Sequence, residues 1–196
     1  MEKSKERKAK GALLIPLAMI VRARKDLDWE KETELTAQDM DKIKKGILAS
    51  IWYELEFFER LARAVAKLIA KNDPKVLSEF GKGLMGNMLL NIYRAPMRYD
   101  DSFAFFTRVT KLINGTLFNT VKAEFQPLEQ GWVFTLSDPD GVPIPELLVP
   151  TFRGIVSAIV EYYQLNKLWI ECEEEPLLHT KKLTKLTFRL IREGKR

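Results

Sequence analysis

The residues best suited to chemistry form an acidic stretch from Glu171 to Glu175, which contains the single cysteine, Cys172, and precedes the single histidine, His179. Thiolate, imidazole and carboxylate groups are the usual ligands of zinc. On a strand, however, Cys172 and Glu174 would share one face while the other acids point to the opposite face. A turn could return His179 towards either set, but the sequence does not require it. We therefore expect a solvated acidic edge, which also discourages aggregation between strands, and no metal site.

Other catalytic arrangements have little support. Cys172 has no histidine at a convincing spacing for nucleophilic catalysis, and the sequence contains no G-x-S-x-G turn. Lys82 stands between two glycines but lacks the rest of a phosphate-binding loop, and no dinucleotide fingerprint occurs. One cysteine excludes an intramolecular disulfide, and one histidine limits haem, zinc and general-base chemistry. We expect a protein that is not an enzyme and carries no cofactor.

Apolar side chains are the better candidates for function. Methionine and aromatic groups adapt to varied apolar shapes, and a mostly apolar cavity suits a hydrophobic ligand. Arg94 could bind a carboxylate or phosphate at the polar end of such a ligand, or it could face solvent or pair with Asp100 or Asp101. Ordinary core packing is the alternative for the whole set. The predicted ligand-binding residues are Trp52, Phe57, Phe58, Met85, Met88, Leu89, Tyr93, Arg94, Phe103 and Phe106.

Helical periodicity dominates the first two thirds of the chain. Thr36 is suited to cap a helix whose apolar stripe continues to Ile51, and Asp73 with Pro74 marks a helix stop and restart. Three glycines near position 83 are costly inside a helix, which suggests a kink or the close approach of another helix or a ligand. The predicted helices begin at 36 and then cover 54–71, 74–93, 102–117 and 145–164.

Strand patterns occupy the remaining segments and set the fold class. Alternating apolar residues and turn signals predict strands over 121–125, 132–136, 167–173 and 183–192, with a turn over 126–131. The expected fold is a single α+β domain over 1–196, in which a helical layer packs on an antiparallel sheet of about four strands. The order is helices-β-β-α-β-β.

The net charge of +5 conceals an uneven distribution. Residues 1–25 carry +6 and residues 181–196 also carry +6, so the intervening body carries −7. A basic N-terminal arm (1–10) and a basic C-terminal tail (192–196) therefore flank an acidic body. These ends could serve solvation or attract nucleic acid or an anionic membrane, but the acidic body argues against a nucleic-acid groove, and we expect no nucleic-acid partner.

The apolar run over 11–21 follows a basic start, as in a secretion signal. Arg22, Arg24 and Lys25 stand where small residues would mark a cleavage site, and eleven residues are too few for a membrane span of about 20 residues. We expect this run to pack on the core of a cytoplasmic protein with no transmembrane segment.

Several short motifs give the chain a family resemblance. They are Lys10-Gly11 before the apolar run, Trp52-Tyr53 before a long helix, the break Asn72-Asp73-Pro74, then Glu79-Phe80-Gly81-Lys82, Asn91-Ile92-Tyr93-Arg94 and closing strands around Trp169 and Phe188. The layout resembles the ligand-binding fold shared by haem NO-binding domains, TRAPP vesicle-tethering subunits and bacterial vinyl-reductase-type regulatory domains. The similarity spans most of the chain and is nearest to bacterial members.

The departures from these families narrow what the resemblance implies. Haem NO-binding domains ligate iron through a helix histidine, whereas His179 lies between predicted strands. Vinyl-reductase-type domains often carry several cysteines near their last strands, and the TRAPP acylation site needs a cysteine on an early helix. Cys172 meets neither pattern. The resemblance implies an apolar pocket and a homodimer, so we expect a ligand-binding or signalling module with a small apolar ligand. The alternative is a structural or adaptor protein whose helical face binds another protein.

Overall fold

The structure is a computed structural model that describes residues 6–87, 107–108, 110–111, 113–128, 131–138, 140, 149–164, 170–174, 178–179 and 184–192. Its helices are α1 (Gly11–Ala23), α2 (Trp29–Glu32), α3 (Ala37–Lys45), α4 (Leu55–Leu68), α5 (Pro74–Asn87) and α7 (Val149–Gln164). Its strands are β1 (Lys8–Lys10), β2 (Trp52–Glu54), β3 (Lys122–Leu128), β4 (Gly131–Ser137), β5 (Ile170–Glu174), β6 (Leu178–His179) and β7 (Thr184–Arg192). Helices and antiparallel strands are thus combined, as an α+β fold requires.

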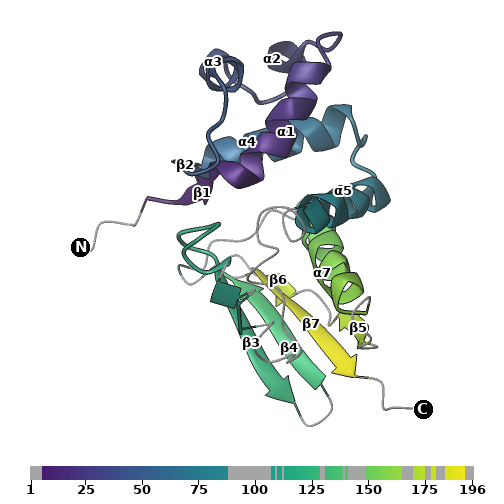
Figure 1. Cartoon of the computed structure of the whole chain (residues 1–196). Coiled ribbons are helices and arrows are strands. Elements are labelled where there is room, and N and C mark those ends of the chain that lie inside the picture. Colours follow the sequence, from purple (N-terminus) through teal and green to yellow (C-terminus); the bar gives the residue numbers. More distant parts are fainter. Residues whose placement is uncertain are drawn as a thin grey trace.

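The larger sheet has the order β3-β4-β7-β5, and β6 pairs with β7 (Figure 1). All its pairs are antiparallel, and the register places Phe125 opposite Phe134 and Phe134 opposite Phe188. The β3–β4 hairpin is tighter than the predicted turn over 126–131, because pairing continues to Leu128 opposite Gly131. The sequence also missed β6, so His179 lies in a short strand and not between strands.

A second, two-stranded sheet joins β1 to β2 in antiparallel register. Three-residue strands give no periodic signal, so the sequence did not predict this pair. It holds the segment before α1 against the segment before α4, so these two helices begin side by side (Figure 1).

The predicted helix boundaries hold where a capping group is present. The Thr36 hydroxyl accepts from the Asp39 amide at 3.1 Å, and the Asp39 carboxylate accepts from the Thr36 amide at 3.1 Å, which completes a capping box for α3. The other end was predicted wrongly. α3 stops at Lys45, Gly46 takes φ 98°, and Ile51 is exposed instead of continuing a buried stripe.

The break between α4 and α5 follows the predicted chemistry. The Asp73 carboxylate accepts from the Lys75 amide at 2.9 Å, and Pro74 is the first residue of α5. Lys71 and Asn72 take positive φ values of 50° and 56°, which reverse the chain within a few residues. Such a conformation is uncommon outside glycine, although asparagine tolerates it better than most residues do.

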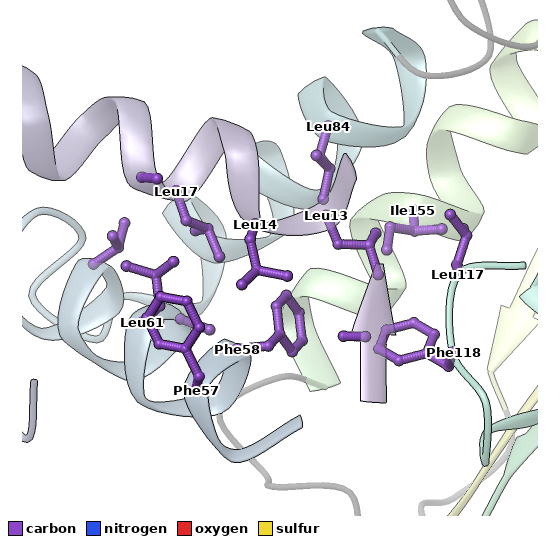
Figure 2. Packing of buried hydrophobic residues seen from close by; sticks show 14 of the residues in the cluster. Leu13, Leu14, Leu17, Phe57, Phe58, Leu61, Leu84, Leu117, Phe118 and Ile155 are labelled. Carbon is purple, nitrogen blue, oxygen red and sulfur yellow. The ribbon is translucent and has the colours of Figure 1, made fainter. Parts of the chain in front are cut away.

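The hydrophobic core lies mainly between α1 and α4 (Figure 2). Leu14 and Leu17 of α1 face Phe58 and Leu61 of α4, and the Phe58 ring meets Phe118 edge-on with centroids 5.8 Å apart. The expectation that the apolar run over 11–21 packs on the core is confirmed. Among the described residues, no helix has the length and apolar character needed to cross a membrane.

Helices α5 and α7 cross at very short range (Figure 1). A Cβ atom at Gly81 would lie 2.0 Å from the Thr151 carbonyl oxygen, and one at Gly154 would lie 1.8 Å from the Ser78 carbonyl oxygen. Two glycines, one on each helix, therefore permit the crossing. The predicted close approach is confirmed at Gly81, whereas a Cβ at Gly83 would meet nothing within 4 Å.

Candidate functional site

An apolar pocket lies where α1, α4, α5 and α7 meet. Among the described lining residues, Thr151 of α7 supplies the one polar side chain. The pocket encloses about 60 Å³. Its described lining consists of Leu17, Ile20, Phe58, Ala62, Val65, Ala66, Ile69, Ala70, Val76, Leu77, Phe80, Leu84 and Thr151.

Small residues on α4 create this space. Ala62 and Ala66 lie four positions apart, and Ala70 follows four positions later, so all three fall on one side of the helix and its continuation. Each is at least nine-tenths buried. Larger side chains from the other helices line the same pocket: Leu17 comes from α1 and Leu84 from α5, and both are labelled in Figure 2.

The pocket reaches the surface beside Val76. This side chain is 44% exposed although it lines the pocket, while its neighbour Leu77 is buried. A void must hold roughly 10–15 Å³ of probe volume for one water molecule, and an engineered apolar cavity of roughly 150 Å³ binds benzene. At about 60 Å³, the present pocket has room for a molecule of a few heavy atoms.

The predicted ligand-binding residues divide into three groups. Phe58 is among the described residues that line the pocket. Phe57 is wholly buried in the core beside Tyr53, with ring centroids 6.2 Å apart, and Trp52 lies under the Lys10 ammonium at 4.2 Å, so neither belongs to the described lining. The backbone of Met85 belongs to α5. The side chain of Met85 and all of Met88, Leu89, Tyr93, Arg94, Phe103 and Phe106 lie outside the described residues.

The sequence did not predict most of the lining residues, although it contains patterns that match them. Leu77, Phe80 and Leu84 repeat at helical spacing along α5, and the alanine row repeats every four residues along α4. Alanines at such spacing are common on buried helix faces. The sequence alone therefore gave no reason to read these positions as a pocket wall.

Charged groups near the pocket lie on its outside. Lys82 of α5 and Glu161 of α7 form an ion pair at 2.6 Å across the helix crossing, and the hydrogen bond that Lys82 donates to Glu161 raises the pKa of Lys82. On α4, burial raises the pKa of the Glu59 carboxyl, and the charge of Arg63 opposes that effect. No ionisable side chain is among the described lining residues, so the pocket offers van der Waals contact and one hydroxyl.

No family model and no curated protein matches the sequence. Solved structures do match in shape. An oxygen-binding H-NOX domain related to soluble guanylate cyclases, in its oxygen complex, superposes with a TM-score of 0.63 at 14% identity, covering 94% of this chain and 95% of that one. The chain has the H-NOX fold. A structure from work on heme distortion in the H-NOX family gives 0.63 at 13% identity, with 94% and 95% coverage. One from work on H-NOX activation gives 0.60 at 14% identity, with 94% and 97% coverage.

The H-NOX fold raises the question of haem, which the described site does not fit. Haem iron is held in proteins by a histidine, cysteine, methionine or tyrosine side chain. None of these residue types is among the described lining residues, and the chain's single histidine lies on β6. A space of about 60 Å³ is also far smaller than a porphyrin. Among the described residues, no group of three or more His, Cys, Asp or Glu side chains could hold a metal ion.

Proposed function

We propose that this chain is a non-enzymatic ligand-binding and signalling module that uses the H-NOX fold to hold a small apolar molecule without haem. The observation that carries the proposal is the alanine-walled pocket between α1, α4, α5 and α7, with Thr151 as its one polar side chain among the described lining residues. Burial of apolar surface drives binding in such a site, and the absence of charge there disfavours ionic ligands.

The size of the pocket defines the ligand class. A molecule of a few heavy atoms fits about 60 Å³ without expansion of the core, which includes dissolved gases and the smallest hydrocarbons. The Thr151 hydroxyl could hydrogen-bond a ligand with one acceptor atom. The ligand would enter beside Val76. This side chain lines the pocket from α5 and is partly exposed, whereas Leu77 and Leu84 on the same helix are buried.

A signal would pass from α5 to α7. The pocket touches both helices, and their crossing at Gly81 and Gly154 brings backbone against backbone with no intervening side chain. Interfaces packed this closely move as discrete units. A ligand that displaces α5 would therefore displace α7, which in turn contacts β5 of the sheet.

Xenon tests the pocket directly, because apolar cavities take up xenon. With methyl-labelled protein under xenon pressure, saturable NMR shifts are expected at Leu17, Leu77 and Leu84. Ala66→Leu should abolish them by filling the pocket, and the milder Ala62→Val should reduce them. Ala37→Leu adds the same atoms at an exposed position on α3 and should change nothing. The proposal would be overturned if the shifts persisted unchanged in Ala66→Leu or extended beyond the lining residues.

Haem requires a separate test. Titration of the purified protein with hemin should give no stoichiometric complex with a shifted Soret band. A one-to-one complex whose Soret band is lost in His179→Ala would refute the haem-free proposal and make this strand histidine an iron ligand.

The family resemblance also leads us to propose a homodimer of the bacterial, TRAPP-like kind. Light scattering on the purified chain, whose monomer mass is 22.7 kDa, distinguishes one copy from two. A monomer at all accessible concentrations would remove the dimer from the proposal and leave the pocket test unaffected.

A further inference from the structure

A second cavity lies on the opposite side of α1 and differs from the pocket in chemistry. It is a surface groove of about 870 Å³ lined by the C-terminal half of α1, by α2 and by α3. Figure 1 shows where these three helices lie. Its described lining consists of Met19, Val21, Arg22, Ala23, Lys25, Leu27, Trp29, Met40, Ile43 and Lys44. We infer that this groove binds the carboxylate end and chain of a medium- or long-chain fatty acid.

The floor of the groove is apolar and well fixed. Val21, Trp29 and Ile43 are nearly fully buried, and they come from three different helices. The Trp29 indole donates to the Arg24 carbonyl at 3.0 Å, which fixes the ring against the end of α1. Met19 stands at the edge and is 64% exposed, so a large flexible apolar side chain faces water there. An alkyl chain that covers this exposed apolar surface removes it from water, which is favourable.

The rim of the groove is cationic. Arg22, Lys25 and Lys44 line it, and no aspartate or glutamate is among the described lining residues. Neighbouring cations are already neutralised, since Arg24 pairs with Asp26 at 2.7 Å and Lys45 pairs with Asp41 at 2.6 Å. Within the described part of the chain, the three rim cations make no ion pair.

Helix ends do not account fully for these charges. The C-terminus of a helix carries about half a negative elementary charge, which favours nearby Lys or Arg. Arg22 lies in the last turn of α1, and Lys44 lies in the last turn of α3 together with Lys42 and Lys45. Three full positive charges exceed the partial charges of two helix ends. The excess favours an anion, and the apolar floor favours an alkyl chain attached to it.

The volume favours a small molecule over a protein segment. Ligand sites of about 300–1,000 Å³ are typical for small molecules, and this groove lies within that range. One anionic head group with a flexible chain satisfies both the rim and the floor. An acidic amphipathic peptide would satisfy the same charges, and it is the competing occupant that the experiment must separate.

Trp29 provides a built-in reporter. The heavy bromine atom of 11-bromoundecanoate quenches tryptophan fluorescence at contact, and the neutral 11-bromoundecanol serves as its uncharged match. We expect saturable quenching by the acid and binding at least about tenfold weaker for the alcohol, which corresponds to about 1.4 kcal/mol. Trp29→Phe should remove the saturable component and leave only the signal from the other three tryptophans.

Charge variants test whether the rim cations contribute to binding of the acid. Lys25→Gln/Lys44→Gln should weaken binding of the bromo acid about tenfold. Lys45 lies on α3 beside Lys44 but is not among the described lining residues, so Lys45→Gln should leave binding unchanged. Equal quenching by acid and alcohol, or equal affinity in both variants, would overturn the inference. So would an acidic amphipathic peptide that binds at Trp29 while the bromo acid does not. Xenon shifts at Leu77 and Leu84 report the other pocket, so the two proposals fail independently.

Discussion

Asp39 and Arg60 form a bidentate ion pair that joins the start of α3 to α4. The Arg60 Nε and Nη2 atoms donate to the two oxygens of the Asp39 carboxylate, both at 2.9 Å. The same carboxylate accepts from the Thr36 amide and is only 1% exposed. One carboxylate therefore completes the capping box of α3 and attaches that helix to the core helix α4.

The two partners should differ in the cost of removal. Arg60→Met leaves a buried carboxylate without its cation, and we expect a loss of about 3 kcal/mol in the free energy of unfolding. Asp39→Asn should cost about half as much, because the amide can still accept from Thr36 and the partly exposed Arg60 can turn to water. Urea denaturation measures both. Lys45→Met breaks an exposed pair and should cost at most about 0.5 kcal/mol. Equal losses in all three variants would show that the buried geometry is unimportant.

This pair should also make stability depend on pH. Burial would raise the pKa of Asp39, but hydrogen bonds from Arg60 and Thr36 outweigh burial and lower that pKa below its ordinary 3.8. The folded state then binds fewer protons than the unfolded state, so the contribution is complete above the ordinary pKa. It is lost as the pH falls from there through the lower folded value.

The pH dependence is isolated by subtraction. Unfolding free energies of wild type and Asp39→Asn should differ most at neutral pH and converge as the pH falls below about 4. A difference that stays constant down to the acid limit would contradict the assigned shift. Glu59→Gln should show the opposite trend. Because burial raises the pKa of the Glu59 carboxyl, its ionised form destabilises the folded state at neutral pH. Wild type should therefore gain stability relative to Glu59→Gln as the pH falls.

Local chemistry explains which parts of the fold the sequence predicted. The Thr36 cap and the Asp73-Pro74 restart depend on neighbouring residues, so their positions could be read directly. The β1–β2 pair depends on contacts such as Lys8 with Glu54, which no short-range pattern encodes. The predicted stripe to Ile51 failed because Gly46 ends α3 first.

The candidate site was harder to predict for a related reason. The pocket depends on Ala66 of α4 and Thr151 of α7, which are distant in the sequence and line the same space only once the chain is folded. A row of small residues sets the width of the pocket, because these positions carry no larger side chains. In a sequence, such a row looks like ordinary core. Phe58 stood out in the sequence because a large aromatic side chain on an apolar helix face is a strong signal.

The α5–α7 crossing gives a prediction with an internal control. Gly81→Ala and Gly154→Ala each force a Cβ against a carbonyl oxygen, so we expect losses of about 1–3 kcal/mol. Gly83→Ala lies in the same helix and would meet nothing within 4 Å. It should raise stability by about 0.5–1 kcal/mol, because alanine is the better helix former.

Thermal or urea unfolding separates these cases, and the double variant adds information. Since both substitutions push the same two helices apart, Gly81→Ala/Gly154→Ala should cost less than the sum of the single losses. If Gly81→Ala and Gly83→Ala behaved alike, the close crossing would not exist in solution.

Arg7 and Asp138 connect the N-terminal segment to the end of β4. Two guanidinium nitrogens of Arg7 lie 2.8 Å from the two carboxylate oxygens, and Asp138 is buried. Arg7→Met leaves that carboxylate unpaired, so we expect a loss of about 3 kcal/mol and faster proteolysis near β1. Lys8→Met is the control, because Lys8 pairs with the exposed Glu6 and should cost less than about 0.5 kcal/mol. Matching stability and matching cleavage rates in the two variants would show that this contact does not hold the first strand in place.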